Sequence, residues 1–309
     1  MTVSDAVESS RSVHKFTHRM VDRPLLRLGL LLVLALSIET YAAGQQAMMG
    51  DGRAPDFETP RPIEVRESLW IEEMTWLEAR DAIAAGKDTI IVGTGGIEQN
   101  GPYTVSGKHN LIMAATGEAI ARKLGNALLA PVVPFVPEGA IDPPDGYMRY
   151  PPTISVEETT YRALLRDVVR SFRAHGFRTI ILMGDSGGNQ QGLEAVANEL
   201  DARWRDEDTR VIYVPEFYDW EGRAQWLRDR GYSEIPEGIH DELSVQAILM
   251  SVDPNTVRLS ERRKAGRTSI NGIDIASEAE VAALGRALIE HIADQTVAAI
   301  KARLGEETR

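Results

Sequence analysis

The chain has 309 residues, with 34 Lys and Arg against 46 Asp and Glu, so its formal charge is −12, and it contains no cysteine. The lack of cysteine excludes disulfide scaffolds, thiol nucleophiles and cysteine-ligated zinc. Nucleic acid is not an expected partner, because binding to a phosphate backbone depends on clustered cationic side chains. Apolar residues make up 43% of the chain, which is the composition of an ordinary globular protein with a substantial core.

Residues 1–44 are predicted to be a secretory signal peptide or a retained N-terminal anchor. An uncharged apolar run from Leu28 to Ile38 follows a basic segment and precedes small residues near Ala42. As a helix this run is too short to cross the hydrocarbon core of a membrane. We therefore expect an exported protein, periplasmic or extracellular, that meets a membrane only through this segment if it is not cleaved. Residues 45–62 combine Gly, Pro and charge without periodicity and are interpreted as a linker.

From residue 63 to residue 309 the pattern alternates between strands and helices, which predicts a single α/β domain. The expected strands are short apolar runs at 88–93, 127–136, 178–183 and 211–215. The expected helices are 111–124 with Asn110 as N-cap, 158–175 with Ser155 and Glu158 as a capping box, 189–204 with Asn189 as N-cap, 219–230, 240–251 and 277–303. Such alternation is typical of a mostly parallel sheet with helices on both faces, whose sites lie beyond the carboxyl ends of the strands.

Polar side chains gather just after two of these strands and before one helix. The first segment runs from Gly93 to His109, the second is G-D-S-G-G-N at 184–189, and the third is His240-Asp-Glu242. His109 and His240 are candidates for a metal ligand or a general base, because they are predicted in loops that carry Gly or Asp. His175 and His291 fall on helices and are expected to be structural.

Together these segments resemble the creatininase (creatinine amidohydrolase) family. The family motif P-x-G-[ST]-x-E-Q-H-G-P-H-L-P-L-x-[TS]-D-T corresponds to VGTGGIEQNGPYTVSGKHN at 92–110, and F-P-G-T-[IL]-S, H-G-F-[RK], N-G-H-G-G-N and H-A-G-x-x-E-T-S follow in order at 150–155, 175–178, 184–189 and from His240. The resemblance implies a creatininase-like α/β domain over 63–309 and hydrolysis of a C–N bond. It also implies two divalent metals, usually zinc or manganese, a metal-bridging water that attacks the amide carbon, and a homo-oligomer.

The family's ligand positions are mostly altered in this chain. Glu98 matches the first metal-ligating glutamate, whereas the other four ligands, His, Asp, His and Glu, fall on Asn100, His109, Ser186 and Val245. A rearranged metal site is our leading interpretation, since imidazole and carboxylate suit zinc, manganese or iron. Its predicted ligands are Glu98, His109, Asp185, His240 and Glu242. A decayed site with ordinary polar loop residues is the alternative.

Ser186 supports a different mechanism. The string G-D-S-G-G at 184–188 matches G-x-S-x-G and lies between a predicted strand and a predicted helix, as a nucleophile elbow requires. The same glycines would also allow a tight turn that presents backbone N–H groups to an anion without any nucleophile.

The leading hypothesis is an exported metal-dependent hydrolase that acts on a C–N bond in a small amide, cyclic amides included. In it His240 is a ligand or proton shuttle, Glu242 is a ligand or base, and Asn100 and Tyr103 orient the substrate. Two alternatives stay open: a serine hydrolase that uses Ser186, and a periplasmic binding or scaffolding protein that has lost catalysis.

Overall fold

The computed structural model describes residues 56–238 and 240–305. The chain divides into two units, Met1–Pro60 and Arg61–Arg309. The predicted signal peptide or anchor and most of the predicted linker lie outside the described residues. The fold below is that of the second unit.

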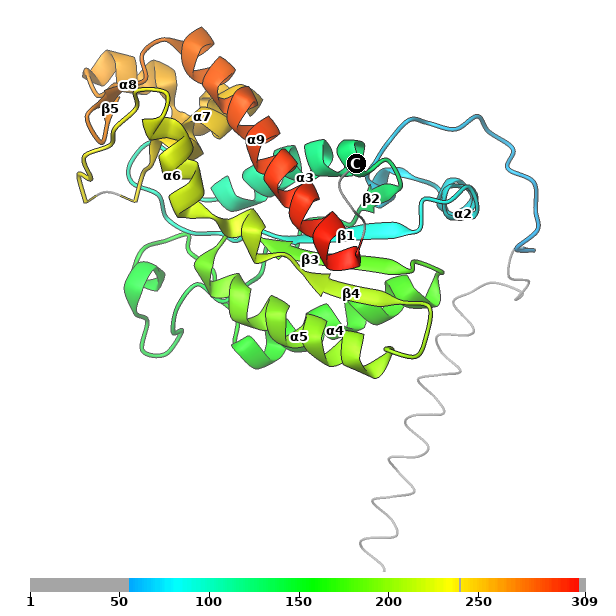
Figure 1. The fold of residues 1–309 in the computed structure, drawn as a ribbon. Coiled ribbons are helices and arrows are strands. Elements are labelled where there is room, and N and C mark those ends of the chain that lie inside the picture. Colours follow the sequence, from blue (N-terminus) through cyan, green and yellow to red (C-terminus); the bar gives the residue numbers. More distant parts are fainter. Residues whose placement is uncertain (1–55, 239, 306–309) are drawn as a thin grey trace, which may run out of the picture. The chain divides into compact units, whose positions relative to one another are not determined.

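This unit is built on a four-stranded parallel sheet (Figure 1). The strands, in the spatial order β2–β1–β3–β4, are β1 (Thr89–Thr94), β2 (Ala127–Leu129), β3 (Thr179–Gly184) and β4 (Arg210–Tyr213). Thr94 of β1 pairs with Gly184 of β3, so these two central strands end side by side. The loops that follow them therefore start from one edge of the sheet, where sites form in open α/β folds.

Helices and one small hairpin complete the unit. They are η1 (Ile71–Glu73), α2 (Trp76–Ala84), α3 (Lys108–Leu124), η2 (Gly146–Arg149), α4 (Glu158–Ala174), η3 (Gly187–Asn189), α5 (Gln190–Arg203), η4 (Pro215–Tyr218), α6 (Trp220–Arg228), α7 (Leu243–Val252), η5 (Pro254–Val257), α8 (Leu259–Ala265), the hairpin β5 (Ser269–Ile270) with β6 (Ile273–Asp274), and α9 (Glu278–Leu304). Within the described residues, no helix is both long and apolar enough to span a membrane.

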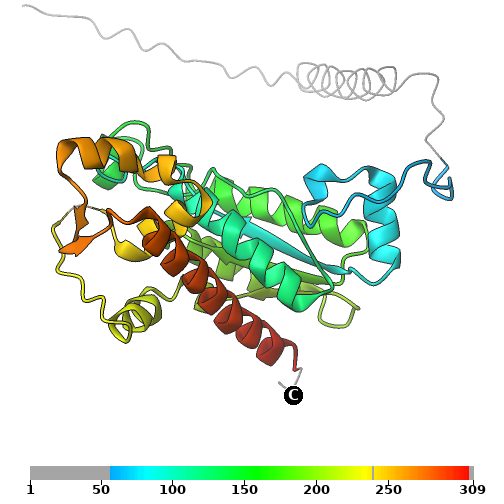
Figure 2. The same ribbon diagram turned by 90° about the horizontal axis from the view of Figure 1, so that it is seen from above.

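The sheet has a buried apolar layer on each face, because successive side chains of a strand point to opposite sides. Ile91 and Ile181 belong to the layer shared with α3, α7 and α9, whereas Ile90 and Ile180 belong to the layer shared with α4 and α5. Figure 1 shows the two groups of helices on opposite sides of the strands, and Figure 2 shows the long helix α9 running beside α3. The prediction of a mostly parallel sheet covered on both faces is confirmed.

Two predicted helix N-caps are wrong, because the polar residues that suggested them form hydrogen bonds with the loops instead. Helix α3 begins at Lys108, after Gly107, and the Asn110 side chain inside its first turn accepts a hydrogen bond from the Gly96 N–H. Helix α4 begins after Glu157 rather than with a capping box. The Ser155 hydroxyl accepts from the N–H of Glu138 and donates to the carbonyl of Gly139.

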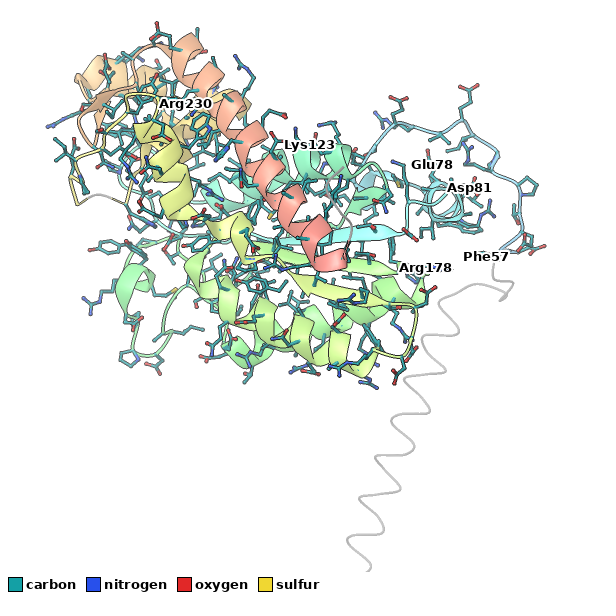
Figure 3. All side chains as sticks on the ribbon, in the orientation of Figure 1. Phe57, Glu78, Asp81, Lys123, Arg178 and Arg230 are labelled. Carbon is teal, nitrogen blue, oxygen red and sulfur yellow. The ribbon has the colours of Figure 1, made fainter. Side chains whose placement is uncertain are left out.

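Other boundaries differ for local reasons. Strand β2 ends at Leu129, well before the predicted end at residue 136, since the prolines at 131 and 134 cannot donate to a ladder. Asn189 precedes α5 as predicted, but its side chain donates to the loop after β1 rather than capping the helix. Helix α2 was not expected from the pattern, although Thr75 and Glu78 form a full capping box at its start; Glu78 is labelled in Figure 3.

Candidate active site

A cavity of about 710 Å³ lies beyond the carboxyl ends of the strands. Its wall comes from the loops after all four strands and from the segment before α7. The polar and aromatic residues that line it are Glu98, His109, Glu138, Tyr147, Ser186, Tyr218, Trp220, Glu221, Glu234, His240, Glu242 and Ser244. The cavity thus brings together four of the five predicted ligands and Ser186, while Asp185 lies behind its wall.

His109 is held between two carboxylates in the first turn of α3. Its Nδ1 lies 2.9 Å from Asp185 Oδ2, and its Nε2 lies 3.1 Å from Glu98 Oε2. Burial alone would lower the pKa of His109, but the hydrogen bonds to Asp185 and Glu98 outweigh it and raise that pKa. Ionised carboxylates only accept hydrogen bonds, so both ring nitrogens carry a proton and His109 is an imidazolium.

Asp185 is fully buried and completes this arrangement from behind. Its second oxygen, Oδ1, accepts from Arg223, 3.2 Å away, and Arg223 also donates to the carbonyl of Phe217. The Asp185 carboxylate therefore fixes the orientation of the His109 ring and is shielded from the cavity.

Lys108, the first residue of α3, is a buried cation at the centre of the site. Its Nζ lies 3.3 Å from Nε2 of His240 and 3.8 Å from Oε2 of Glu98, and the residue is 1% exposed. Burial lowers the pKa of Lys108, and the carboxylates of Glu98 and Glu242 oppose that effect.

His240 is a neutral imidazole with a defined tautomer. Nδ1 lies 3.3 Å from the carbonyl oxygen of Gln99, which can only accept, so Nδ1 carries the proton and Nε2 accepts from Lys108. Burial, followed by the charge of Lys108, lowers the pKa of His240. The ring of Tyr147 stacks on that of His240 with centroids 4.5 Å apart.

Glu138 is a carboxyl group in this cavity whose pKa lies near neutral pH. Burial, and then the charge of Glu98, raise the pKa of Glu138 to about 7. The Ser186 hydroxyl donates to its Oε2 at 3.0 Å, while its Oε1 is buried without a hydrogen-bond partner. A carboxyl group with such a pKa can accept and return a proton near neutral pH.

Gly188 explains how Glu138 reaches Ser186. A Cβ atom at residue 188 would lie 1.9 Å from the carbonyl oxygen of Pro137, so only glycine allows the segment that carries Glu138 to pack against η3. The second glycine of G-x-S-x-G is therefore required for close packing of two loops.

Glu242 is a second carboxyl group prepared for proton transfer. Burial raises its pKa, and its Oε2 is buried without a hydrogen-bond partner.

The two residues predicted to orient the substrate, Asn100 and Tyr103, do not line this cavity. Asn100 is 1% exposed and donates to the carbonyl of Glu98, and Tyr103 lines a separate cavity, where Arg262 lies over its ring.

Sequence reasoning missed Lys108, Glu138 and the aromatic wall of Tyr147, Tyr218 and Trp220. Lys108 stood beside His109 in the quoted motif, and its position in the predicted loop before the helix at 111–124 gave no hint of burial. Glu138 lies in a proline-containing loop without periodicity, so only the packing of that loop against η3 reveals it.

The backbone of Ser186 does not form a nucleophile elbow. Its φ of −110° and ψ of 148° are ordinary extended values, whereas an elbow holds its serine in a strained turn. Among the described residues no histidine hydrogen-bonds to Ser186; its hydroxyl is bound to Glu138. The arrangement of a serine, a histidine and an acid is therefore not formed here.

A parallel α/β sheet with a polar cavity beyond the carboxyl ends of its strands is typical of enzymes that bind small molecules, and comparisons narrow this class. Residues 72–300 match the creatininase family, described as creatinine amidohydrolase, and the chain belongs to this family. It is 25% identical over 158 residues to the creatinine amidohydrolase of Pseudomonas putida, a match that covers 50% of this chain and 59% of that protein.

Solved structures agree in fold. A manganese form of creatininase has a TM-score of 0.56 and 20% identity, and a substituted creatininase of the Zn–Zn type has the same values; each comparison covers 77% of this chain and 99% of the other. At this identity the likeness establishes the fold alone.

The side chains of this chain do not fit a divalent metal as they are arranged. A metal-ligating histidine must offer a lone pair, yet His109 has protons on both ring nitrogens and the free lone pair of His240 is used by Lys108. In the described part of the chain, no group of three or more His, Cys, Asp or Glu is placed to hold a metal ion. Relatives with zinc and manganese support a divalent metal for the family, whereas the predicted ligand set of this chain stays a prediction.

Proposed function

We propose that this protein hydrolyses a C–N bond in a small amide bound in the 710 Å³ cavity. The observation that carries the proposal is the Glu138 carboxyl group, which has a pKa of about 7 and lines the same cavity as Glu98. Family membership supplies the reaction class. The size of the cavity and the aromatic side chains of Tyr147, Tyr218 and Trp220 suit a small ring or planar amide.

In the proposed reaction Glu138 moves the proton. It accepts a proton from the attacking water as the oxygen bonds to the carbonyl carbon, and it returns that proton to the nitrogen as the C–N bond breaks. Ser186 orients Glu138 through its hydroxyl, and Glu242 lies across the same cavity as a second proton carrier. Because the side chains do not fit a metal as arranged, no step is assigned to one.

A panel of small amides tests the proposal. Creatinine and other five- and six-membered cyclic amides are incubated with the protein, and ring opening is followed by proton NMR. Turnover by the wild type that falls about 100-fold or more in Glu138→Gln supports the proposal. The control is Glu199→Gln, which changes an exposed carboxylate paired with Arg166 far from the cavity. Turnover that is unchanged in Glu138→Gln would contradict the role of Glu138.

A non-catalytic binding or scaffolding protein is the second candidate, and the altered ligand positions favour it. Four of the five family ligands are replaced, at Asn100, His109, Ser186 and Val245. Saturable binding of an amide, seen by calorimetry, without any turnover would identify this function. The serine-hydrolase alternative has no comparable support, because the Ser186 backbone is extended.

Export and self-association remain part of the proposal. The short apolar run from Leu28 to Ile38 after a basic segment supports export. Fusion of residues 1–44 to a reporter enzyme that is active only outside the cytoplasm tests it. Light scattering coupled to gel filtration tests whether the chain forms the homo-oligomer that the resemblance implies.

A further inference from the structure

Two consecutive residues of the chain bring positive charge into this site. Lys108 and His109 are both buried, at 1% and 3% exposure, and both contact Oε2 of Glu98, at 3.8 and 3.1 Å. Buried charges are tolerated when they are paired and hydrogen-bonded. Here a single carboxylate oxygen lies between an ammonium and an imidazolium.

The imidazole lone pairs that a metal would need are already used. Both ring nitrogens of His109 are hydrogen-bonded to carboxylates, Nδ1 to Asp185 at 2.9 Å and Nε2 to Glu98 at 3.1 Å, and Nε2 of His240 lies 3.3 Å from the Lys108 ammonium. Asp185 is in turn bound by Arg223, so its oxygens are both occupied. The ammonium of Lys108 thus lies among the side chains that a metal would have to bind.

The position of the two cations in the fold is unfavourable by itself. They are the first two residues of α3, where the helix dipole repels positive charge, and no acidic residue of the helix's first turn offsets them. A neutral pair would form this helix end at lower cost. The carboxylates of Glu98 and Asp185, from the loops after β1 and β3, compensate for the cations and so tie α3 to both strands.

We propose that this chain has replaced the divalent metal of its family by an internal cation pair, Lys108 and His109, which holds Glu98, Asp185 and His240 in place. The folded site therefore neither binds nor needs a divalent metal. Lys108 acts as a positioning residue in this arrangement, because it reaches the cavity only through Glu98 and His240. This proposal concerns what holds the site together, so it is independent of whether an amide is hydrolysed.

The first test uses the wild-type protein, purified without a histidine tag or chelator from cells grown with added zinc and manganese. We expect less than about 0.1 divalent ion per chain by mass spectrometry. We also expect the Tm to be unchanged by EDTA, Zn²⁺ or Mn²⁺, since a ligand that binds only the folded state raises it. Close to one or more ions per chain, with a Tm that EDTA lowers, would overturn the proposal.

The second test removes the ammonium. In Lys108→Met the lone pair of His240 and the carboxylates of Glu98 and Glu242 become available, so this variant is expected to lose stability and to gain a Tm increase with Zn²⁺. Lys108→Arg, which keeps the charge, is expected to gain none. A Lys108→Met protein that is as stable as the wild type and takes up no Zn²⁺ would contradict the role of Lys108.

The matched control is Lys123→Met at the other end of the same helix. Lys123, labelled in Figure 3, is partly exposed and pairs with Glu290 and Asp294 of α9. The Lys123→Met substitution removes one lysine charge and two ion pairs at a distance from the cavity. We expect the Tm of this variant to respond to Zn²⁺ as the wild-type Tm does. If Lys108→Met does not fold, the wild-type metal content and the EDTA response decide the question alone. All readouts are made without substrate, so an inactive protein still gives a result.

Discussion

At the scale of single residues, Glu98 and Glu138 share one cavity but differ in their surroundings. Burial would raise the pKa of Glu98, yet the hydrogen bond from His109 and the charges of Lys108 and His109 outweigh it and lower that pKa. Glu138 is partly buried and has no ion pair within the described part of the chain, and its pKa rises to about 7. Two carboxyl groups whose pKa values differ in this way take different roles. Glu98 is ionised near neutral pH, and Glu138 can exchange a proton there.

The raised pKa of Glu138 predicts a pH-dependent stability. Between its ordinary pKa of 4.5 and about 7 the folded protein holds the Glu138 proton that the unfolded chain releases. The free energy of unfolding therefore falls as pH rises through this window, by about 3 kcal/mol in total. Urea unfolding at about pH 5, 6, 7 and 8 should show this loss in the wild type, and Glu138→Gln should lack it.

A Glu199→Gln control is expected to keep the wild-type slope, because Glu199 is exposed and pairs with Arg166. Parallel pH profiles of unfolding free energy for the wild type and Glu138→Gln would show that Glu138 ionises normally.

Ser186 is predicted to act as a support for Glu138 and not as a nucleophile. Its extended backbone and its bond to Glu138 leave no imidazole to activate it. A fluorophosphonate probe should leave the wild type unlabelled. Ser186→Ala should lower kcat/KM by less than about 100-fold, against losses on the order of 10⁶-fold when a serine nucleophile is removed. Covalent labelling that disappears in Ser186→Ala would restore the serine-hydrolase interpretation.

At the scale of elements, the strands and helices could be predicted from the sequence, whereas the contacts made by the loops could not. Strands β1 and β3 follow from short continuous apolar runs, which are buried on both faces of the sheet, and helices α4 and α9 follow from apolar residues at helical spacing. The site was predictable as far as the loops after β1 and β3, since strand ends locate it. The hydrogen-bond partners of the polar side chains could not be predicted. Asn110 and Ser155, for example, look like helix caps in the sequence, but in the fold they form contacts between loops.

Lys108 is the clearest example of a site residue that the sequence pattern could not predict. A lysine in a helix is normally solvated, and its burial becomes visible only when β1, β3 and the segment before α7 are assembled around it. The tertiary arrangement, and not the local pattern, turns Lys108 and His109 into the charge centre of the site.

Two adjacent glycines of η3 provide a sharp test of the packing between loops. In Gly188→Ala the new Cβ meets the backbone carbonyl of Pro137, which cannot move without displacing Glu138. We expect a loss of about 1–3 kcal/mol in the free energy of unfolding. In the matched variant Gly187→Ala the nearest atom is the Tyr218 hydroxyl, 3.2 Å away at the end of a side chain, so the loss should stay below about 1 kcal/mol.

Urea titrations of both variants measure the difference. Equal losses in the two variants would mean that the approach of Pro137 to Gly188 is not a constraint on the fold.

At the scale of the whole molecule, the charge of the chain and that of the cavity have the same sign. The formal charge is −12, and five glutamates line the cavity against two histidines, with Lys108 buried behind them. Like charges focused in a cavity repel an anionic ligand over several ångströms. Aromatic side chains in the same wall attract a cation or a neutral planar group.

We therefore predict that the cavity selects neutral or cationic amides. A cyclic amide should bind at least about 10-fold more tightly than its analogue with one added carboxylate, and raising the salt from about 0.05 to about 0.5 M should narrow the difference, because exposed charges are screened. Calorimetric titration of such a pair measures both effects. Glu234→Gln, which removes a lining charge, should weaken the discrimination, whereas Glu199→Gln should not. Equal or tighter binding of the anionic analogue would show that the buried cations, and not the glutamates, set the potential that a ligand meets in the cavity.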